Sequence, residues 1–124
     1  MQFEGKVVLV TGGGRGIGRY IALAFAREGA DTVIVGRNEA ALEQTAKDIR
    51  DTGRSVLAVP MDISISAPVS QLFEKLRGTY GRLDVLVNNA AIEGPTAEIT
   101  EVTDEQWDEA MAINVTGVAL CIKH

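Results

Sequence analysis

The stretch from Lys6 to Gly18, which reads K-V-V-L-V-T-G-G-G-R-G-I-G, constrains the fold more than any other part of the chain. Its apolar run, Val7–Val10, predicts a buried strand, and the glycine cluster that follows predicts a tight turn. Apolar residues then recur at helical spacing at Ile17, Ile21 and Phe25, so we expect a helix directly after the turn. Such an arrangement brings free backbone N–H groups and the positive end of a helix dipole to one place, which suits a phosphate or pyrophosphate.

The spacing of these glycines separates three phosphate-binding patterns. The dinucleotide pattern G-x-G-x-x-G fits in no register, and the P-loop pattern G-x-x-x-x-G-K-[ST], started at Gly13, lacks its lysine and its hydroxyl. The pattern that fits is T-G-x-x-x-G-I-G, at Thr11, Gly12, Gly16, Ile17 and Gly18. Here the sequence resembles the short-chain dehydrogenase/reductase family, which implies that the last four of these residues bind a dinucleotide. An ordinary glycine-rich turn is the alternative interpretation.

Four valine-rich runs alternate with three helical patterns along the first two thirds of the chain. The runs are Val7–Val10, Thr32–Val35, Val56–Val59 and Leu83–Val87, and the helical stretches span about Ile17 to Glu28, Glu39 to Arg50 and Ile65 to Tyr80. The runs barely alternate, as is typical of strands covered on both faces. The expected fold class is therefore α/β: a Rossmann-like doubly wound parallel sheet in three αβα layers, with strand order 3-2-1-4.

A last helix is predicted to begin at Thr103, which forms a T-x-x-Q capping box with Gln106. Its expected apolar face consists of Trp107, Met111, Val115, Val118 and Ile122. The helical pattern is still running at His124, so we expect residues 1–124 to form a single NAD(P)-binding domain that is truncated after the fourth strand and its following helix. The fourth run would form an edge of the sheet that its own residues do not protect, so we expect a further strand or a second chain to cover it. Shielding by its own loop is the alternative.

Two further segments extend the resemblance. Asn88-Asn89-Ala90-Ala91 follows the fourth run and matches the family's N-N-A-G segment, with Ala91 in place of glycine. The resemblance implies that Asn88, Asn89 and Ala90 line the adenosine side of the cofactor, although the asparagines can also serve local backbone groups. It likewise implies that Asp62 contacts the adenine amino group and that the backbone amide of Ile63 lies on the ring. A turn carboxylate is the competing interpretation of Asp62.

The end of the second run bears on the choice between NAD and NADP. An acidic residue there would bind the ribose 2′-hydroxyl of NAD, whereas a nearby arginine accommodates the 2′-phosphate of NADP. The segment reads Val35-Gly36-Arg37-Asn38, and Arg15 lies within the glycine turn. Because arginine carries a permanent charge and forked donors, Arg37 and Arg15 favour NADP over NAD. Solvated surface charges are the alternative.

The resemblance also indicates which catalytic groups to seek. Asn114 falls seven residues after Trp107, on the expected apolar face of the last helix. In its context I-N-V-T-G it matches an asparagine that helps hold a water in the family's proton relay, and a structural polar residue is its competing interpretation. The serine and the Tyr-x-x-x-Lys pair that carry the family's chemistry do not occur in these 124 residues. The predicted parent activity is NADP(H)-dependent hydride transfer between a small-molecule carbonyl and the alcohol. This chain alone is expected to bind NADP weakly and to be inactive.

Composition narrows the alternatives. The net charge is −5 with no basic cluster, which argues against nucleic acid and anionic membranes as partners. No run of 18 apolar residues and no signal peptide are found, and the single cysteine indicates a reducing cytoplasm. Cys121 and His124 are the only Cys and His, so no metal site is expected. A non-catalytic nucleotide-binding module and a self-associating module remain as alternatives, and a homo-oligomer is expected.

Overall fold

The computed structural model describes residues 1–90 and 101–123. Strands and helices alternate through most of this length, as the sequence predicts. The elements are β1 (Val7–Thr11), α1 (Gly16–Arg27), β2 (Asp31–Gly36), α2 (Glu39–Arg50), β3 (Val56–Pro60), α3 (Ser66–Tyr80), β4 (Val85–Val87), α4 (Asp104–Met111), the π-helix η2 (Ala112–Gly117) and α5 (Val118–Lys123). In the described ranges, no helix is long and apolar enough to cross a bilayer.

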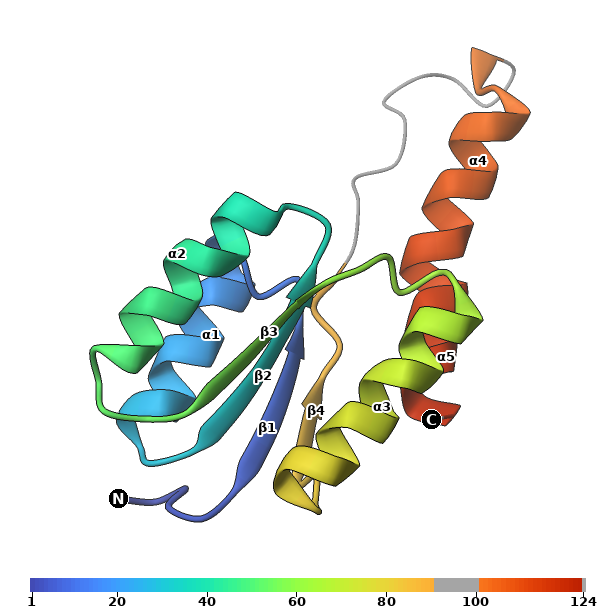
Figure 1. Ribbon diagram of the computed structural model, residues 1–124. Coiled ribbons are helices and arrows are strands. Elements are labelled where there is room, and N and C mark those ends of the chain that lie inside the picture. Colours follow the sequence, from blue (N-terminus) through green and yellow to red (C-terminus); the bar gives the residue numbers. More distant parts are fainter. Residues whose placement is uncertain (91–100, 124) are drawn as a thin grey trace.

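The four strands form one parallel sheet in the order β3-β2-β1-β4. Leu9 of β1 is in register with Val33 of β2 on one side and with Leu86 of β4 on the other. The predicted strand order and fold class are therefore confirmed. All four carboxyl ends lie at one edge of the sheet, and the point where the strand order reverses falls between β1 and β4 (Figure 1). Open sheets of this kind bind ligands outside that switch point.

Helices cover both faces of the sheet, giving the three expected layers (Figure 1). Helices α1 and α2 pack on one face, where their apolar residues share a core with Val8, Val10 and Ile34 of the strands. Helix α3 and the end of the last helix pack on the other face, around Leu9 and Val33. An ion pair between Arg19 and Asp48 joins α1 to α2. Burial of this apolar surface on both faces is the main source of the sheet's stability.

The helix ends follow local rules that the sequence shows. Asn38 Oδ1 accepts a hydrogen bond of 2.9 Å from the backbone N–H of Ala41 and so caps α2. Thr103 and Gln106 form the predicted capping box, with bonds of 3.1 and 3.0 Å. Helix α3 ends before Gly81, whose φ of 71° lies in the left-handed region that favours glycine.

The expected apolar face of the last helix is wrong. Of its five residues, Trp107, Met111, Val115 and Ile122 are 53, 40, 51 and 67% exposed, and Val118 is half-buried. The buried residues are instead Ile113, Gly117 and Cys121. The physical reason is close approach: a Cβ at Gly117 would lie 2.6 Å from Cγ1 of Ile63, so only a glycine lets the helix pack there. Helix α4 contributes no buried residue and extends beyond the carboxyl edge of the sheet (Figure 1).

Candidate functional site

A pocket of about 410 Å³ lies at the carboxyl edge of the sheet. Its walls come from the glycine turn, the ends of β2 and β3, the start of α2, the segment after β4, and η2. The lining residues are Gly12, Gly14, Arg15, Val35, Gly36, Arg37, Asn38, Ala41, Leu42, Met61, Asp62, Ile63, Asn89, Ala90 and Ile113. Seven of the residues predicted to bind a cofactor thus converge on one cavity, although they come from separate parts of the chain.

The glycine turn is held in place by its neighbours. The N–H groups of Gly12 and Gly13 donate to the carbonyl of Val35 at 2.8 and 3.2 Å, so these two amides are already engaged within the protein. Helix α1 begins at Gly16, and among the described residues no side chain caps its first turn. The amides that can donate to an anionic ligand are therefore those at the start of α1. The sequence predicted free backbone N–H groups at the turn, and the N–H groups of Gly12 and Gly13 are not among them.

Thr11, to which the sequence argument assigned no role, joins β1 to the segment after β4. Its side chain is fully buried; the hydroxyl donates to the carbonyl of Val87 at 3.3 Å and accepts from the N–H groups of Asn89 and Ala90 at 3.0 and 2.9 Å. The side-chain amide of Asn89 in turn donates to the carbonyl of Gly12 at 3.3 Å. This network places the Asn89–Ala90 backbone against the glycine turn. The sequence did point to Thr11, because this threonine is the first residue of the motif T-G-x-x-x-G-I-G.

Replacing Thr11 with valine keeps the shape of the side chain but removes the hydroxyl. Thr11→Val should lower the free energy of unfolding by about 1–3 kcal/mol, because the N–H of Ala90 loses its acceptor and the N–H of Asn89 keeps only its bond to the carbonyl of Val87. Thr11→Ser, the control, keeps the hydroxyl and loses one buried methyl group, worth about 0.8 kcal/mol. Urea denaturation measures both variants. A Thr11→Val protein as stable as Thr11→Ser would contradict this role.

Charged side chains of both signs meet at the rim of the pocket. Nη1 of Arg37 lies 3.7 Å from Oε1 of Glu109 on α4. The hydroxyl and the backbone N–H of Ser64 both donate to Oδ1 of Asp62, at 2.6 and 2.9 Å. The Ser64 hydroxyl bond is the main cause that lowers the pKa of Asp62, burial opposes it, and the backbone bond and the charge of Arg37 add to the lowering. Asp62 is therefore a carboxylate at neutral pH, fixed in orientation by Ser64.

The other predicted site residues lie outside the pocket walls. Gly16, Ile17 and Gly18 form the first turn of α1; Ile17 is 73% exposed and does not pack inward as its spacing suggested. Asn88 is exposed directly after β4. Asn114 is exposed on η2, whereas the sequence argument placed it on a buried face. The structure thus does not bring Asn114 together with the pocket, although the preceding residue, Ile113, lines it.

Eight lining residues were not predicted as site residues from the sequence. They are Gly14, Val35, Gly36, Asn38, Ala41, Leu42, Met61 and Ile113. Those on or near α2 line the pocket because Thr45 of that helix donates to the carbonyl of Gly14 at 3.3 Å, which holds the helix against the turn. No three His, Cys, Asp or Glu side chains gather among the described residues. Burial raises the pKa of the Cys121 thiol.

A parallel sheet with flanking helices and a glycine turn at its switch point defines a Rossmann-like fold. A family model described as short chain dehydrogenase matches residues 6–124, and the chain belongs to this family. It is 39% identical over 122 residues to the short chain dehydrogenase/reductase dpfgG of Gibberella zeae, covering 98% of this chain and 45% of that protein. The chain therefore spans about half the length of this relative.

Solved structures agree with the sequence comparison. An NAD⁺-bound xylitol dehydrogenase superposes with a TM-score of 0.95 at 31% identity, over 99% of this chain and 47% of that one. A metagenomic short-chain oxidoreductase in complex with NADP superposes with a TM-score of 0.94 at 28% identity, over 99% of this chain and 56% of that one. The two structures hold different dinucleotides, so likeness of fold does not select between NAD and NADP.

Proposed function

We propose that this chain is the cofactor-binding half of an oxidoreductase that transfers a hydride between NADP(H) and a small carbonyl or alcohol. The observation that supports it most is the convergence of Arg15, Arg37, Asp62 and Asn89 on one pocket beside the start of α1. The residues fit a dinucleotide, because they combine an uncapped helix start, two arginines and a pocket next to the sheet's switch point.

Each part of the pocket suits a different part of the cofactor. The pyrophosphate is assigned to the glycine turn and the first turn of α1, through Gly12, Gly16, Ile17 and Gly18. The adenine is assigned to the pocket side formed by Asp62, Ile63, Asn89 and Ala90, to which Ile113 adds an apolar wall. Asn88, outside the pocket wall, is assigned to the same side of the cofactor. A Cβ at Gly12 would lie 2.9 Å from Nδ2 of Asn89 and 3.1 Å from Cα of Ala90, so the turn and this segment approach as closely as a glycine permits.

Arg37 and Arg15 are assigned to the 2′-phosphate of NADP. Gly36 ends β2, so no carboxylate is available there to bind a ribose 2′-hydroxyl. The guanidinium of Arg37 instead lies at the rim, half exposed and within reach of a phosphate. This arrangement favours NADP, and NAD is the second candidate.

The bound cofactor would supply or accept the hydride, and this chain would bind and orient it. Asn114 is assigned to the proton relay, and the serine and tyrosine–lysine groups of the family would have to come from outside these residues. We place the protein in the cytoplasm and expect it to self-associate, since the exposed apolar residues Trp107, Met111, Val115 and Ile122 lie along the last helix.

Calorimetry with NADP, NAD and adenosine 2′,5′-bisphosphate tests the proposal. We expect this chain to bind NADP and the bisphosphate weakly, to bind NAD more weakly still, and to turn over no alcohol. Light scattering on the same sample reports the oligomeric state. If neither this chain nor a longer protein that contains it binds any of these nucleotides, the assignment is wrong. Measured dehydrogenase activity from these 124 residues would contradict the proposal that they bind the cofactor but lack the groups needed for catalysis.

A further inference from the structure

We propose that Glu109 is a specificity-determining residue that competes with the cofactor's 2′-phosphate for Arg37. The inference rests on the proposed function. Glu109 belongs to α4, which has no buried residue and extends past the sheet (Figure 1). In the described part of the chain, the contact with Arg37 is the one ion pair between α4 and the rest of the protein. It brings a carboxylate to the arginine that the 2′-phosphate would need.

The surroundings of Arg37 show which carboxylate can give way. Asp62 also interacts electrostatically with Arg37, but two hydrogen bonds from Ser64 hold its carboxylate in place. Glu109 has no such restraint among its described contacts: its side chain is 58% exposed, and its distance to the guanidinium is 3.7 Å. An exposed pair at this distance is weak and readily exchanged. A phosphate, with two negative charges and several acceptor oxygens, is the stronger partner for an arginine.

The competition has a defined consequence for selectivity. When a 2′-phosphate takes Arg37, Glu109 loses its partner and stays near a dianion, which costs binding free energy. A nucleotide with a free 2′-hydroxyl leaves the ion pair intact and meets no such cost. Glu109 therefore lowers affinity for NADP without lowering affinity for NAD, and so limits a preference that the two arginines create.

Replacing Glu109 with glutamine tests this directly, because the side chain keeps its length and loses its charge. Glu109→Gln should raise affinity for NADP and for adenosine 2′,5′-bisphosphate about two- to fivefold, a range set by the strength of exposed ion pairs. Affinity for NAD and for AMP should stay unchanged. The gain should shrink as salt is raised, since both charges are exposed. Titration calorimetry measures all four ligands without any turnover.

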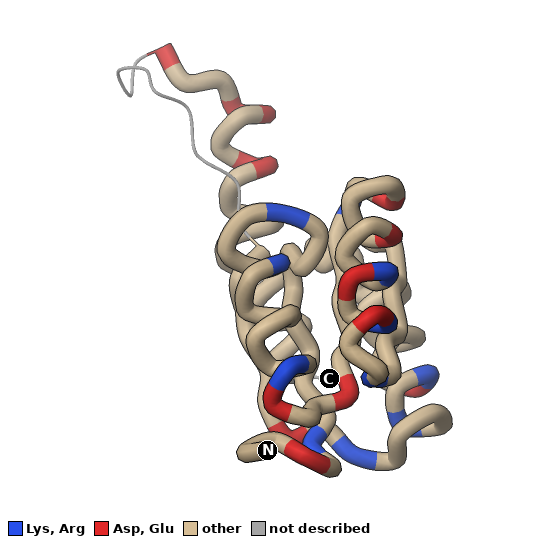
Figure 2. Tube along the Cα trace, turned by 90° about the vertical axis from the view of Figure 1, so that its left-hand side faces the viewer, with Lys and Arg blue, Asp and Glu red and all other residues tan. Residues whose placement is uncertain are grey.

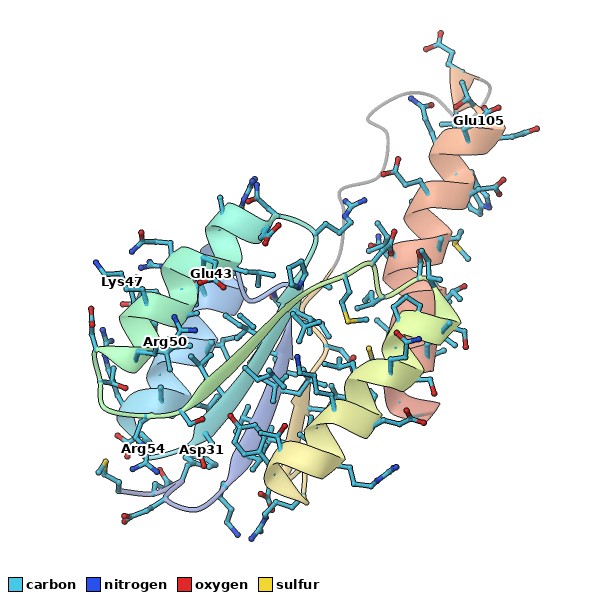
Figure 3. The ribbon with its side chains drawn as sticks, in the orientation of Figure 1. Asp31, Glu43, Lys47, Arg50, Arg54 and Glu105 are labelled. Carbon is cyan, nitrogen blue, oxygen red and sulfur yellow. The ribbon has the colours of Figure 1, made fainter. Side chains whose placement is uncertain are left out.

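Glu105→Gln is the matched control. Glu105 lies one turn earlier on α4 and close to the far end of that helix (Figure 3). Figure 2 shows that acidic residues recur along α4, so a general negative field is the rival explanation. If the field matters rather than the contact, Glu105→Gln will give the same gain as Glu109→Gln, and the inference is overturned. The contact predicts no gain from Glu105→Gln.

A second pair of variants isolates Arg37. In an Arg37→Gln background, Glu109→Gln should no longer change the ratio of NADP to NAD affinity, because no arginine remains to be contested. A gain that persists there, or a gain shared equally by NADP and NAD, overturns the inference. If the unaltered protein binds NADP but Glu109→Gln leaves the ratio unchanged, only this inference falls. If neither this chain nor a longer protein that contains it binds any nucleotide, the proposed function falls and this inference with it.

Discussion

Gly18→Ala is expected to destabilise the protein by about 1–3 kcal/mol and to abolish nucleotide binding. The added methyl group would overlap the carbonyl oxygen of Gly12 and the side-chain nitrogen of Asn89, and would lie 2.8 Å from the carbonyl carbon of Gly12. The carbonyl belongs to the glycine turn, so the clash cannot be relieved by a rotating side chain. The turn and the start of α1 would have to separate at the place where the pyrophosphate is assigned. Urea denaturation measures the first effect and calorimetry the second.

Gly78→Ala provides a control with the opposite sign. Gly78 also lies within a helix, α3, but a Cβ there would have no neighbour within 4 Å. The alanine should stabilise the protein by about 0.5–1 kcal/mol, because it restricts the unfolded chain and suits a helix. Nucleotide binding should not change. Two glycine-to-alanine variants of equal stability would show that the close approach at Gly18 is not required.

Arg37→Asp is expected to reverse the cofactor preference. Loss of charge-assisted bonds to the 2′-phosphate, worth about 1.5–3 kcal/mol, should weaken NADP binding about 10- to 150-fold. The new carboxylate can accept a hydrogen bond from a ribose 2′-hydroxyl, so NAD binding should hold or improve. Calorimetry with NADP and NAD gives the ratio of affinities.

Arg50→Asp is the matched control for charge. Arg50 is an exposed residue at the far end of α2, where it pairs with Glu43 at 3.9 Å (Figure 3). Arg50→Asp makes the same change of charge as Arg37→Asp, but at a position away from the pocket. It should therefore leave the ratio of NADP to NAD affinity unchanged. An unchanged ratio in Arg37→Asp would remove the argument for NADP from this chain.

The layout of the sheet could be predicted from sequence because its signals are local and repeated. Continuous apolar runs mark strands that are covered on both faces, and chirality then leaves few ways to connect them. The caps at Asn38 and Thr103 were also predictable, since a cap depends on one side chain and a backbone group two or three residues away. For the site, the glycine motif and the strand ends led to the pocket because parallel strands end at the same edge.

The last helix was not predictable in the same way. Periodicity identifies an apolar stripe on a helix but does not say whether the rest of the protein covers it. This helix carries two such stripes, and only one of them is buried. The larger residues, such as Trp107, are exposed, whereas Ile113, Gly117 and Cys121 pack inward. The π-helix at Ala112–Gly117 adds to the difficulty, because its wider turns rotate the faces of the helix relative to an ideal α-helix. Asn114 was therefore expected on the buried side of the helix, whereas it is exposed, and the inward position of Ile113 was not predicted.

The hydrogen bonds around the glycine turn also bear on how a ligand would bind. Val35 holds Gly12 and Gly13, and Thr45 holds Gly14, so three successive residues of the loop are anchored from β2 and α2. Conformational entropy that a loose loop would lose on association is already lost during folding, which makes the loop preorganised. Affinity is then coupled to the integrity of β2 and α2, and loosening either element would weaken binding with no ligand contact removed.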